Sequence, residues 1–134
     1  VVRYRGPGDY YRFHWDAERS VRRITRVLGG VATVLAQDSV PYDALRWYRL
    51  ELVAQGTLLR ALVDGREVLR ATDAAHAQGR IGCTTWANSL TAFDDLIVRV
   101  GDATGAPPGP LLEERFEGAF SVPWVFVDDG TVEG

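Results

Sequence analysis

The chain has 134 residues, a formal net charge of −3 and 46% hydrophobic residues. This length and composition exclude an intrinsically disordered segment and allow one domain with a core of its own. The small net charge argues against a general nucleic-acid binder, and no apolar run reaches the ~18 residues of a membrane span. All 15 basic residues are arginine and methionine is absent. We therefore expect a processed product or a slice of a longer protein.

Apolar and polar residues alternate along the first part of the chain, with turn residues at short intervals, which predicts β-strands. The strands predicted there cover residues 1–5, 10–15, 21–28 and 31–36. Gly29-Gly30 separates the last two of these strands and indicates a β-hairpin. In the strand at 10–15, Tyr10, Arg12 and His14 share one face, because successive side chains point to opposite sides of a strand. The opposite face carries Tyr11, Phe13 and Trp15.

The same alternation continues after a loop that contains Pro41. The strands predicted in this part cover residues 46–54, 58–63, 66–71, 81–86 and 92–100. Asp64-Gly65 is a strong hairpin signal between two of them. Residues 71–78, which include His76, are expected to form at most one helical turn. In the first of these strands, the residues expected to face inward are Tyr48, Leu50, Leu52 and Ala54.

A segment rich in glycine and proline, residues 101–110, reads as a linker stiffened by proline. After it, residues 111–117 and 122–127 have strand character. The single cysteine, Cys83, lies in an apolar run and is expected to be a small buried hydrophobic residue.

From about residue 10 to residue 100, the order of elements resembles the concanavalin-A-like, laminin-G-like jelly roll of bacterial multimodular proteins. Members of that family include domains described as 3-keto-disaccharide hydrolase or as similar to glycoside hydrolase family 16. The resemblance implies an all-β fold, an antiparallel β-sandwich. It rests on Asp9-Tyr10-Tyr11-Arg12-Phe13, Arg46-Trp47-Tyr48-Arg49-Leu50, Leu62-Val63-Asp64-Gly65, Gly79-Arg80-Ile81-Gly82 and Ala92-Phe93-Asp94-Asp95-Leu96.

The segment after the linker, residues 112–118 followed by Trp124, resembles the opening strand of the same family. The resemblance thus implies that residues 1–100 are the later part of a β-sandwich domain. Residues 111–134 would then be the opening strand of the same, permuted domain or of a following one. Two outcomes are compatible with this order. The tail either folds back and supplies the first strand of its own sheet, or it pairs with another chain, because an unpaired strand edge invites aggregation.

The aromatic, amide and arginine side chains of this sequence suit carbohydrate binding. Exposed aromatic rings stack on the C–H faces of sugars, while amides and arginine hydrogen-bond the sugar hydroxyls. The alternative is that several of these aromatic rings belong to the core. The residues predicted to bind a ligand are Trp86, Asn88, Trp47, Tyr10, Arg12 and His14.

The resemblance also implies a possible structural calcium ion. In similar carbohydrate-binding jelly rolls, an acid of the last strand helps to hold Ca²⁺ with oxygens of the first strand. The corresponding acids are Asp94, Asp95 and Glu117. Calcium takes about six to eight oxygen ligands, so the alternative is a solvated acidic pair.

An arginine series near the first hairpins suggests a basic face for a carboxylate, sulfate or phosphate, or a solvated face balanced by acids. The series comprises Arg12, Arg19, Arg22, Arg23 and Arg26. No catalytic residue is predicted, because the two suitably spaced carboxylates of a glycosidase are not recognisable in the sequence.

Three functions remain. The first is a non-catalytic carbohydrate-binding module of a larger secreted or surface protein. The second is a structural or assembly module that pairs strands with a neighbouring chain through residues 111–134. The third is a glycoside-modifying enzyme, for which fold analogy alone is a weak argument. We expect an extracellular or cell-surface location, with a glycan as partner and neither nucleic acid nor a membrane span.

Overall fold

The computed structural model describes residues 1–86, 91–99 and 110–114. The chain divides into two compact units, Val1–Thr84 and Thr85–Gly134. The described part contains strands and no helix, hence none long and apolar enough to cross a membrane. The strands are β1 (Val2–Gly6), β2 (Asp9–Asp16), β3 (Val21–Leu28), β4 (Val31–Ser39), β5 (Leu50–Gln55), β6 (Leu58–Val63), β7 (Arg66–Thr72), β8 (Leu96–Arg99) and β9 (Pro110–Glu114).

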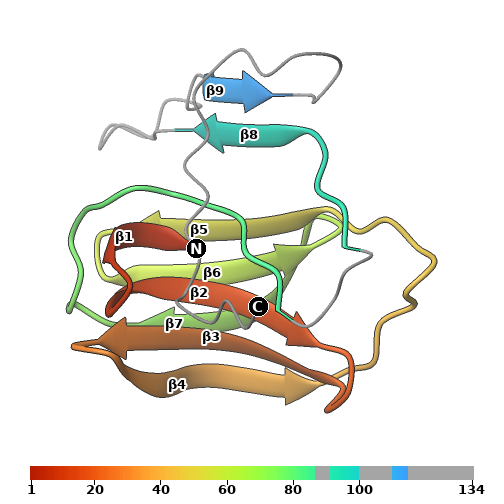
Figure 1. The fold of residues 1–134 in the computed structure, drawn as a ribbon, viewed down its shortest axis with the longest axis horizontal. Helices are drawn as coiled ribbons and strands as arrows, with labels where there is room; N and C mark the ends of the chain where they lie inside the picture. The colour runs from red at the N-terminus through yellow and green to blue at the C-terminus, as the bar shows by residue number, and fades with distance from the viewer. Residues whose placement is uncertain (87–90, 100–109, 115–134) are drawn as a thin grey trace, which may run out of the picture. The chain divides into compact units, whose positions relative to one another are not determined.

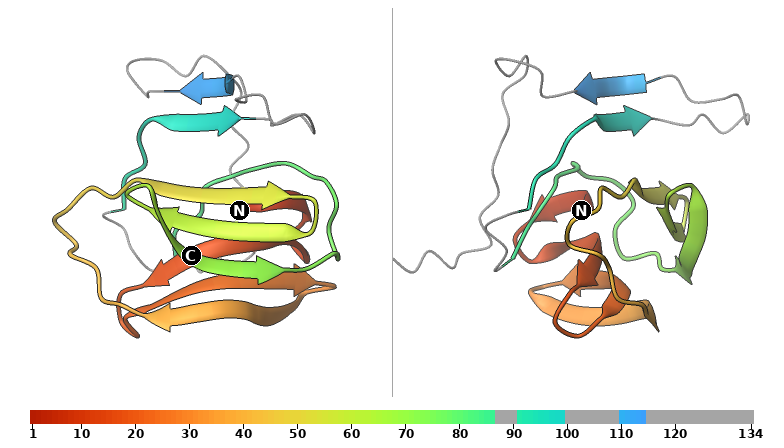
Figure 2. Two further views of the ribbon diagram at one scale, coloured as in Figure 1. Left: turned by 180° about the vertical axis from the view of Figure 1, so that it is seen from behind. Right: turned by 90° about the vertical axis from the view of Figure 1, so that its right-hand side faces the viewer.

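The first unit is an antiparallel β-sandwich, as the sequence predicts. One sheet has the order β1-β2-β3-β4 and the other the order β5-β6-β7, so each sheet follows the chain (Figure 1). The two further views in Figure 2 show these sheets as separate layers. The jelly-roll connectivity that the resemblance implies stays a prediction.

Two tight turns set the register of the hairpins. Gly29 and Gly30 have φ values of 56° and 79°, and Asp64 and Gly65 have φ values of 51° and 79°. Positive φ at both central residues is the type I′ geometry, whose twist matches that of the flanking strands. Both predicted hairpins are therefore confirmed.

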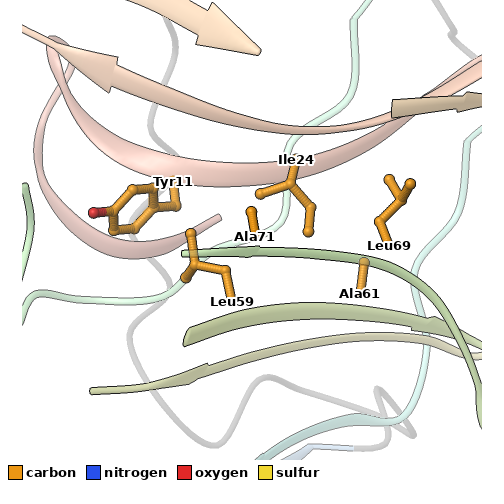
Figure 3. Packing of buried hydrophobic residues seen from close by; sticks show 6 residues of the cluster. All are labelled: Tyr11, Ile24, Leu59, Ala61, Leu69 and Ala71. Carbon is orange, nitrogen blue, oxygen red and sulfur yellow. The ribbon is translucent and has the colours of Figure 1, made fainter. Parts of the chain in front are cut away.

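The core lies between the two sheets. Tyr11 and Ile24 come from the four-stranded sheet, and both are fully buried. They meet four residues of the other sheet, drawn as sticks in Figure 3: Leu59, Ala61, Leu69 and Ala71. Phe13 packs against this cluster from the same face of β2 as Tyr11. The alternation in β2 therefore indicated correctly which face of the strand is turned toward the core.

The backbone of residues 80–82 pairs with the free edge of β1. The N–H groups of Tyr4 and Arg80 each donate to the other residue's carbonyl at 2.9 Å. At Gly79, next to this bridge, a Cβ would lie 2.4 Å from the carbonyl carbon of Arg3. Only glycine allows the two backbones to approach so closely. The strand predicted at 81–86 is nevertheless wrong, because the pairing is an isolated bridge.

Two other predictions in this unit need correction. Strand β5 begins at Leu50 and not at residue 46. In the register of β5 and β6, the first pair is Leu50 with Val63. Strand β6 ends at Val63, before the turn at Asp64-Gly65, so residues 46–49 have no partner strand. Leu50 shares the inner face but is half exposed. Residues 73–79 form an irregular segment and not a helical turn, since the Asp73 carboxylate accepts the Ala75 N–H at 2.9 Å.

Cys83 is exposed, which contradicts the expectation of a buried hydrophobic residue. The segment that carries it lies at the outer edge of β1 and not between the sheets, because its backbone pairs with the first residue of the chain. The Gly82 N–H donates to the carbonyl of Val1 at 3.1 Å. The apolar run that contains Cys83 is therefore an edge segment and not a strand of the core.

The second unit contains a two-stranded antiparallel sheet of β8 and β9, in which Ile97 lies opposite Glu113. The strand predicted at 92–100 is observed only at Leu96–Arg99, and the one predicted at 111–117 at Pro110–Glu114. Strand β9 thus pairs within its own chain. The predicted strand at 122–127 and most of the predicted linker lie outside the described residues, and the domain boundaries stay predictions.

Candidate functional site

Three of the six predicted ligand-binding residues lie together on the sheet face opposite the core. In the register of β2 and β3, Tyr10 pairs with Val27, Arg12 with Thr25, and His14 with Arg23. Directly paired residues share a face, so this face is continuous across the two strands. The ring of Tyr4, from β1, lies 5.8 Å from that of Tyr10. We call this surface the outer face; it comprises Tyr4, Tyr10, Arg12, His14, Arg23, Thr25 and Val27. Thr25 and Val27 are buried, at 2% and 5% exposure.

The outer face carries unused hydrogen-bonding capacity. Arg12 Nε, His14 Nδ1 and Thr25 Oγ1 are shielded from solvent, yet none has a partner in the described part of the chain. An unsatisfied polar atom of this kind costs on the order of 1–3 kcal/mol. A nitrogen donor, an imidazole nitrogen and a hydroxyl next to an aromatic pair suit a ligand that is rich in hydroxyl groups and has an apolar side.

His14 is uncharged at neutral pH. Burial, together with the positive charges of Arg12 and Arg23, lowers its pKa from 6.5 to about 4. A neutral imidazole can both donate and accept a hydrogen bond, whereas the protonated ring only donates. The outer face therefore presents His14 to a ligand as a neutral group above about pH 5.

The lowered pKa of His14 predicts a loss of stability in mild acid. The unfolded chain binds a proton near pH 6.5 and the folded chain only near pH 4, so the free energy of unfolding falls as the pH falls through this window. Because the residue is only partly buried, we discount the effect to about 1 kcal/mol, or roughly 4–8 °C in Tm. Thermal unfolding at pH 7.5 and 4.5 should show that His14→Gln loses less stability than the wild type. An equal loss in both proteins would contradict the prediction.

Trp47 lies in the loop that precedes β5, and its side chain is 67% exposed. The loop is held by an aromatic cluster. The ring of Trp15 lies 5.4 Å from that of Tyr42 and 5.0 Å from that of Tyr48, and Trp15 Nε1 donates to the Val40 carbonyl at 2.7 Å. The cluster gives Trp47 a well-supported position, but Trp15 itself lies on the inner face of β2 and does not contribute to the outer face.

The two remaining predicted ligand residues belong to the second unit. Trp86 is 67% exposed and belongs to the second unit, and Asn88 lies outside the described residues. Their part in ligand binding stays a prediction.

The predicted calcium ligands are only partly described. Asp94 and Asp95 are exposed and precede β8, so they do not lie within a strand as expected. Asp95 has a φ of 51°, and its N–H donates to Asp94 Oδ1 at 2.8 Å, as in a local turn. Glu117 lies outside the described residues. Within residues 1–86 and 91–99, no three or more histidine, cysteine, aspartate or glutamate side chains gather as a metal site would require. The calcium ion stays a prediction.

The arginine series is largely paired within the first unit. Arg19 lies 3.0 Å from Asp16, and Arg26 lies 2.9 Å from Asp73. Arg22 forms a two-pronged contact with Asp38, and Arg23 donates to Gln37 Oε1 at 3.1 Å. Acids therefore balance Arg19, Arg22 and Arg26, as the alternative reading expects. Arg12 Nε and Arg26 Nε are buried without a partner among the described residues.

A polar network at one end of the core is absent from the sequence predictions. Tyr11 Oη donates to Asp73 Oδ1 at 2.5 Å, and Arg26 donates to Asp73 Oδ2 at 2.9 Å. The backbone N–H of His76 donates to Tyr11 Oη at 3.1 Å, and Arg3 donates to the His76 carbonyl at 2.8 Å. The sequence Asp73-Ala74-Ala75 could have indicated a turn at Asp73. No local signal could have indicated the long-range bonds of this network, whose partners are 47 to 73 residues apart in the sequence.

Burial and hydrogen bonding act in opposite directions on Asp73. Burial raises its pKa, but the bonds from Tyr11 and Ala75 and the charge of Arg26 outweigh burial, so the pKa lies below the ordinary 3.8. Burial and the bond to Asp73 raise the pKa of Tyr11. Asp73 is thus charged and Tyr11 neutral at physiological pH, as this donor–acceptor arrangement requires.

Comparison with known proteins gives two partial similarities. The levanase of Bacillus subtilis (strain 168) is 28% identical over 76 residues, which is 57% of this chain, and the chain spans 11% of that protein's length. The solved structure of the carbohydrate binding module CBM66 from Bacillus subtilis is 26% identical, with a TM-score of 0.49 over 52% of this chain and 44% of that one. No family model matches the chain. The resemblance to laminin-G-like domains stays a prediction.

Proposed function

We propose that this chain is a non-catalytic carbohydrate-binding module of a larger secreted or cell-surface protein. The observation that carries the proposal is the outer face, where the tilted rings of Tyr4 and Tyr10 share a surface with three polar atoms that have no partner among the described residues. Such a face combines an apolar platform with hydrogen-bonding groups, the combination that sugar recognition needs.

Each part of the outer face has a role in this proposal. Tyr10, supported by Tyr4, receives the C–H side of a sugar ring. Arg12 donates to ring hydroxyls in a fixed fork, and the neutral His14 exchanges hydrogen bonds with neighbouring hydroxyls. No bond is made or broken in this scheme, so the module anchors a polysaccharide and leaves its chemistry to other parts of the protein.

The partial match to the levanase supports a module rather than a whole enzyme. The shared stretch is 76 residues long, and the chain spans 11% of the relative's length. The relative's name makes levan the first polysaccharide to test, although the two proteins are only 28% identical in the matched stretch.

The test is isothermal titration calorimetry of the intact chain against levan and a panel of other soluble polysaccharides. We expect binding to at least one, with at least a tenfold loss of affinity in Tyr10→Ala and in Arg12→Ala. Arg66→Ala, an exposed arginine of the other sheet, is the matched control and should bind normally.

Two outcomes would contradict the proposal. Absence of binding to the whole panel would remove carbohydrate binding. Loss of binding in Trp47→Ala, with Tyr10→Ala unaffected, would move the site from the outer face to the loop before β5.

A further inference from the structure

A pocket of about 380 Å³ lies in the first unit. Its lining comes from three separate parts of the chain: Arg3 of β1, Gly56 and Thr57 of the β5–β6 turn, and Ala74, His76 and Ala77 of the segment 73–79. Its volume lies near the lower end of the range of about 300–1,000 Å³ for small-molecule pockets. The small side chains of the lining leave room for one sugar ring and not for a chain.

The charge around this pocket is positive. Arg26 and Asp73 neutralise each other at 2.9 Å, and no acidic side chain lines the cavity. Arg3 donates one hydrogen bond, to the uncharged carbonyl of His76, and it has no ion-pair partner among the described residues. Its guanidinium therefore has further N–H groups for a planar acceptor such as a carboxylate.

The backbone around Arg3 fixes where this guanidinium lies. Arg3 has a φ of 52°, in the left-handed region that arginine rarely occupies. The isolated bridge between Tyr4 and Arg80 and the close approach of Gly79 hold the residue in this conformation. Backbone strain that neighbouring contacts maintain is a feature of ligand sites.

The ring of His76 is buried beside the pocket. The residue is 1% exposed, and its Nε2 lies 2.7 Å from the Val27 carbonyl oxygen. Since that oxygen can only accept, Nε2 carries the hydrogen. Nδ1 has no partner among the described residues. The groups of the pocket that can meet a ligand are therefore the guanidinium of Arg3 and the side chain of Thr57.

We infer that this pocket binds a carboxylate-bearing sugar residue, a uronic acid, with the carboxylate against the guanidinium of Arg3. The sugar part of this inference rests on the proposed function, whereas the charge preference rests on Arg3 alone. Thr57 and the backbone of segment 73–79 meet the ring hydroxyls. The site is separate from the outer face, so the module has one surface for a polysaccharide and one pocket for an acidic residue.

The test is an NMR titration of the intact chain with glucuronate and, as a neutral match, glucose. We expect glucuronate to shift the amide resonances of residues 56, 57 and 74–77 with a millimolar Kd, and glucose to bind at least tenfold more weakly. Raising the salt from 0.05 to 0.5 M should weaken glucuronate binding severalfold, because the attraction is between charges.

Variants of Arg3 separate the carboxylate contact from stability. Arg3→Ala should reduce affinity for glucuronate at least tenfold. Arg3→Lys keeps a cation but loses the planar fork, so it should bind with intermediate affinity. Arg5→Ala, an exposed arginine on the same strand, is the matched control and should bind like the wild type. If Arg3→Ala does not fold, the comparison of Arg3→Lys with the wild type tests the carboxylate contact.

Three results would overturn the inference. The first is that glucuronate shifts no resonances, and the second is that Arg3→Lys and the wild type bind glucuronate equally. The third is that acetate and glucuronate bind equally, which would show that the sugar ring contributes nothing to binding. The proposed function fails separately. If the chain binds glucuronate but none of the polysaccharides, the result would count against the outer face and not against this pocket.

Discussion

Replacing Asp73 with alanine is expected to destabilise the β-sandwich unit by about 3 kcal/mol. The carboxylate, whose side chain is 9% exposed, accepts bonds from Tyr11 Oη, Arg26 and the Ala75 N–H. Its removal leaves a partly buried guanidinium and a buried hydroxyl without their acceptor, and breaking such a pair from one side costs about 3–5 kcal/mol. Urea unfolding followed by tryptophan fluorescence measures the change.

Two further variants separate charge from hydrogen bonding. Asp73→Asn keeps the shape and should lose less stability than alanine. Tyr11→Phe removes the donor to Asp73 and the acceptor of the His76 N–H, and should lose about 1–3 kcal/mol. Because the pKa of Asp73 is lowered on folding, its contribution is present above pH 3.8 and is lost as the pH falls below it. A loss under 1 kcal/mol in Asp73→Ala at pH 7 would show that the network is not a stabilising contact.

Replacing Leu59 with alanine is expected to cost about 3 kcal/mol, within the usual 2–5 kcal/mol for a buried leucine. Leu59 is fully buried between the sheets and contacts the cluster of Tyr11 and Ile24. The unit has 84 residues, and a domain of that size is stable by roughly 5–10 kcal/mol. One cavity thus removes a large part of its stability.

Leu45→Ala is the matched control for this substitution. Leu45 is 96% exposed in the loop before β5, so the same change should alter the free energy of unfolding by less than about 0.5 kcal/mol. Equal urea midpoints for the two variants would contradict the assignment of the core.

The fold of the first unit could be predicted from the sequence where the signals are local. Alternation placed Tyr11 toward the core, and Gly29-Gly30 and Asp64-Gly65 marked two turns that the structure contains. Strand β3 has the predicted bounds, Val21–Leu28. A period of two residues and a dipeptide turn are properties of short segments, so they can be recognised without knowing what packs against them.

What could not be predicted depends on contacts between distant residues. The alternation of residues 46–49 continues that of β5, but its partner strand ends at Val63, so no ladder forms there. Cys83 lies in an apolar run, yet the run follows the edge of β1 and remains exposed. At the candidate site, the alternation in β2 correctly grouped Tyr10 with Arg12 and His14 on one face. The pocket beside Arg3 could not be predicted, because its lining comes from three separate segments of the chain.

The segment 73–79 also bears on the order in which the unit folds. The hairpins within each sheet join neighbouring stretches of chain, which close rapidly because little chain entropy is lost. The bonds from Tyr11 to Asp73 and from Arg3 to His76 span 62 and 73 residues. Contacts of that sequence separation form slowly. We expect the two meanders to form first and the 73–79 segment to close over them last, as the final step that joins the sheets.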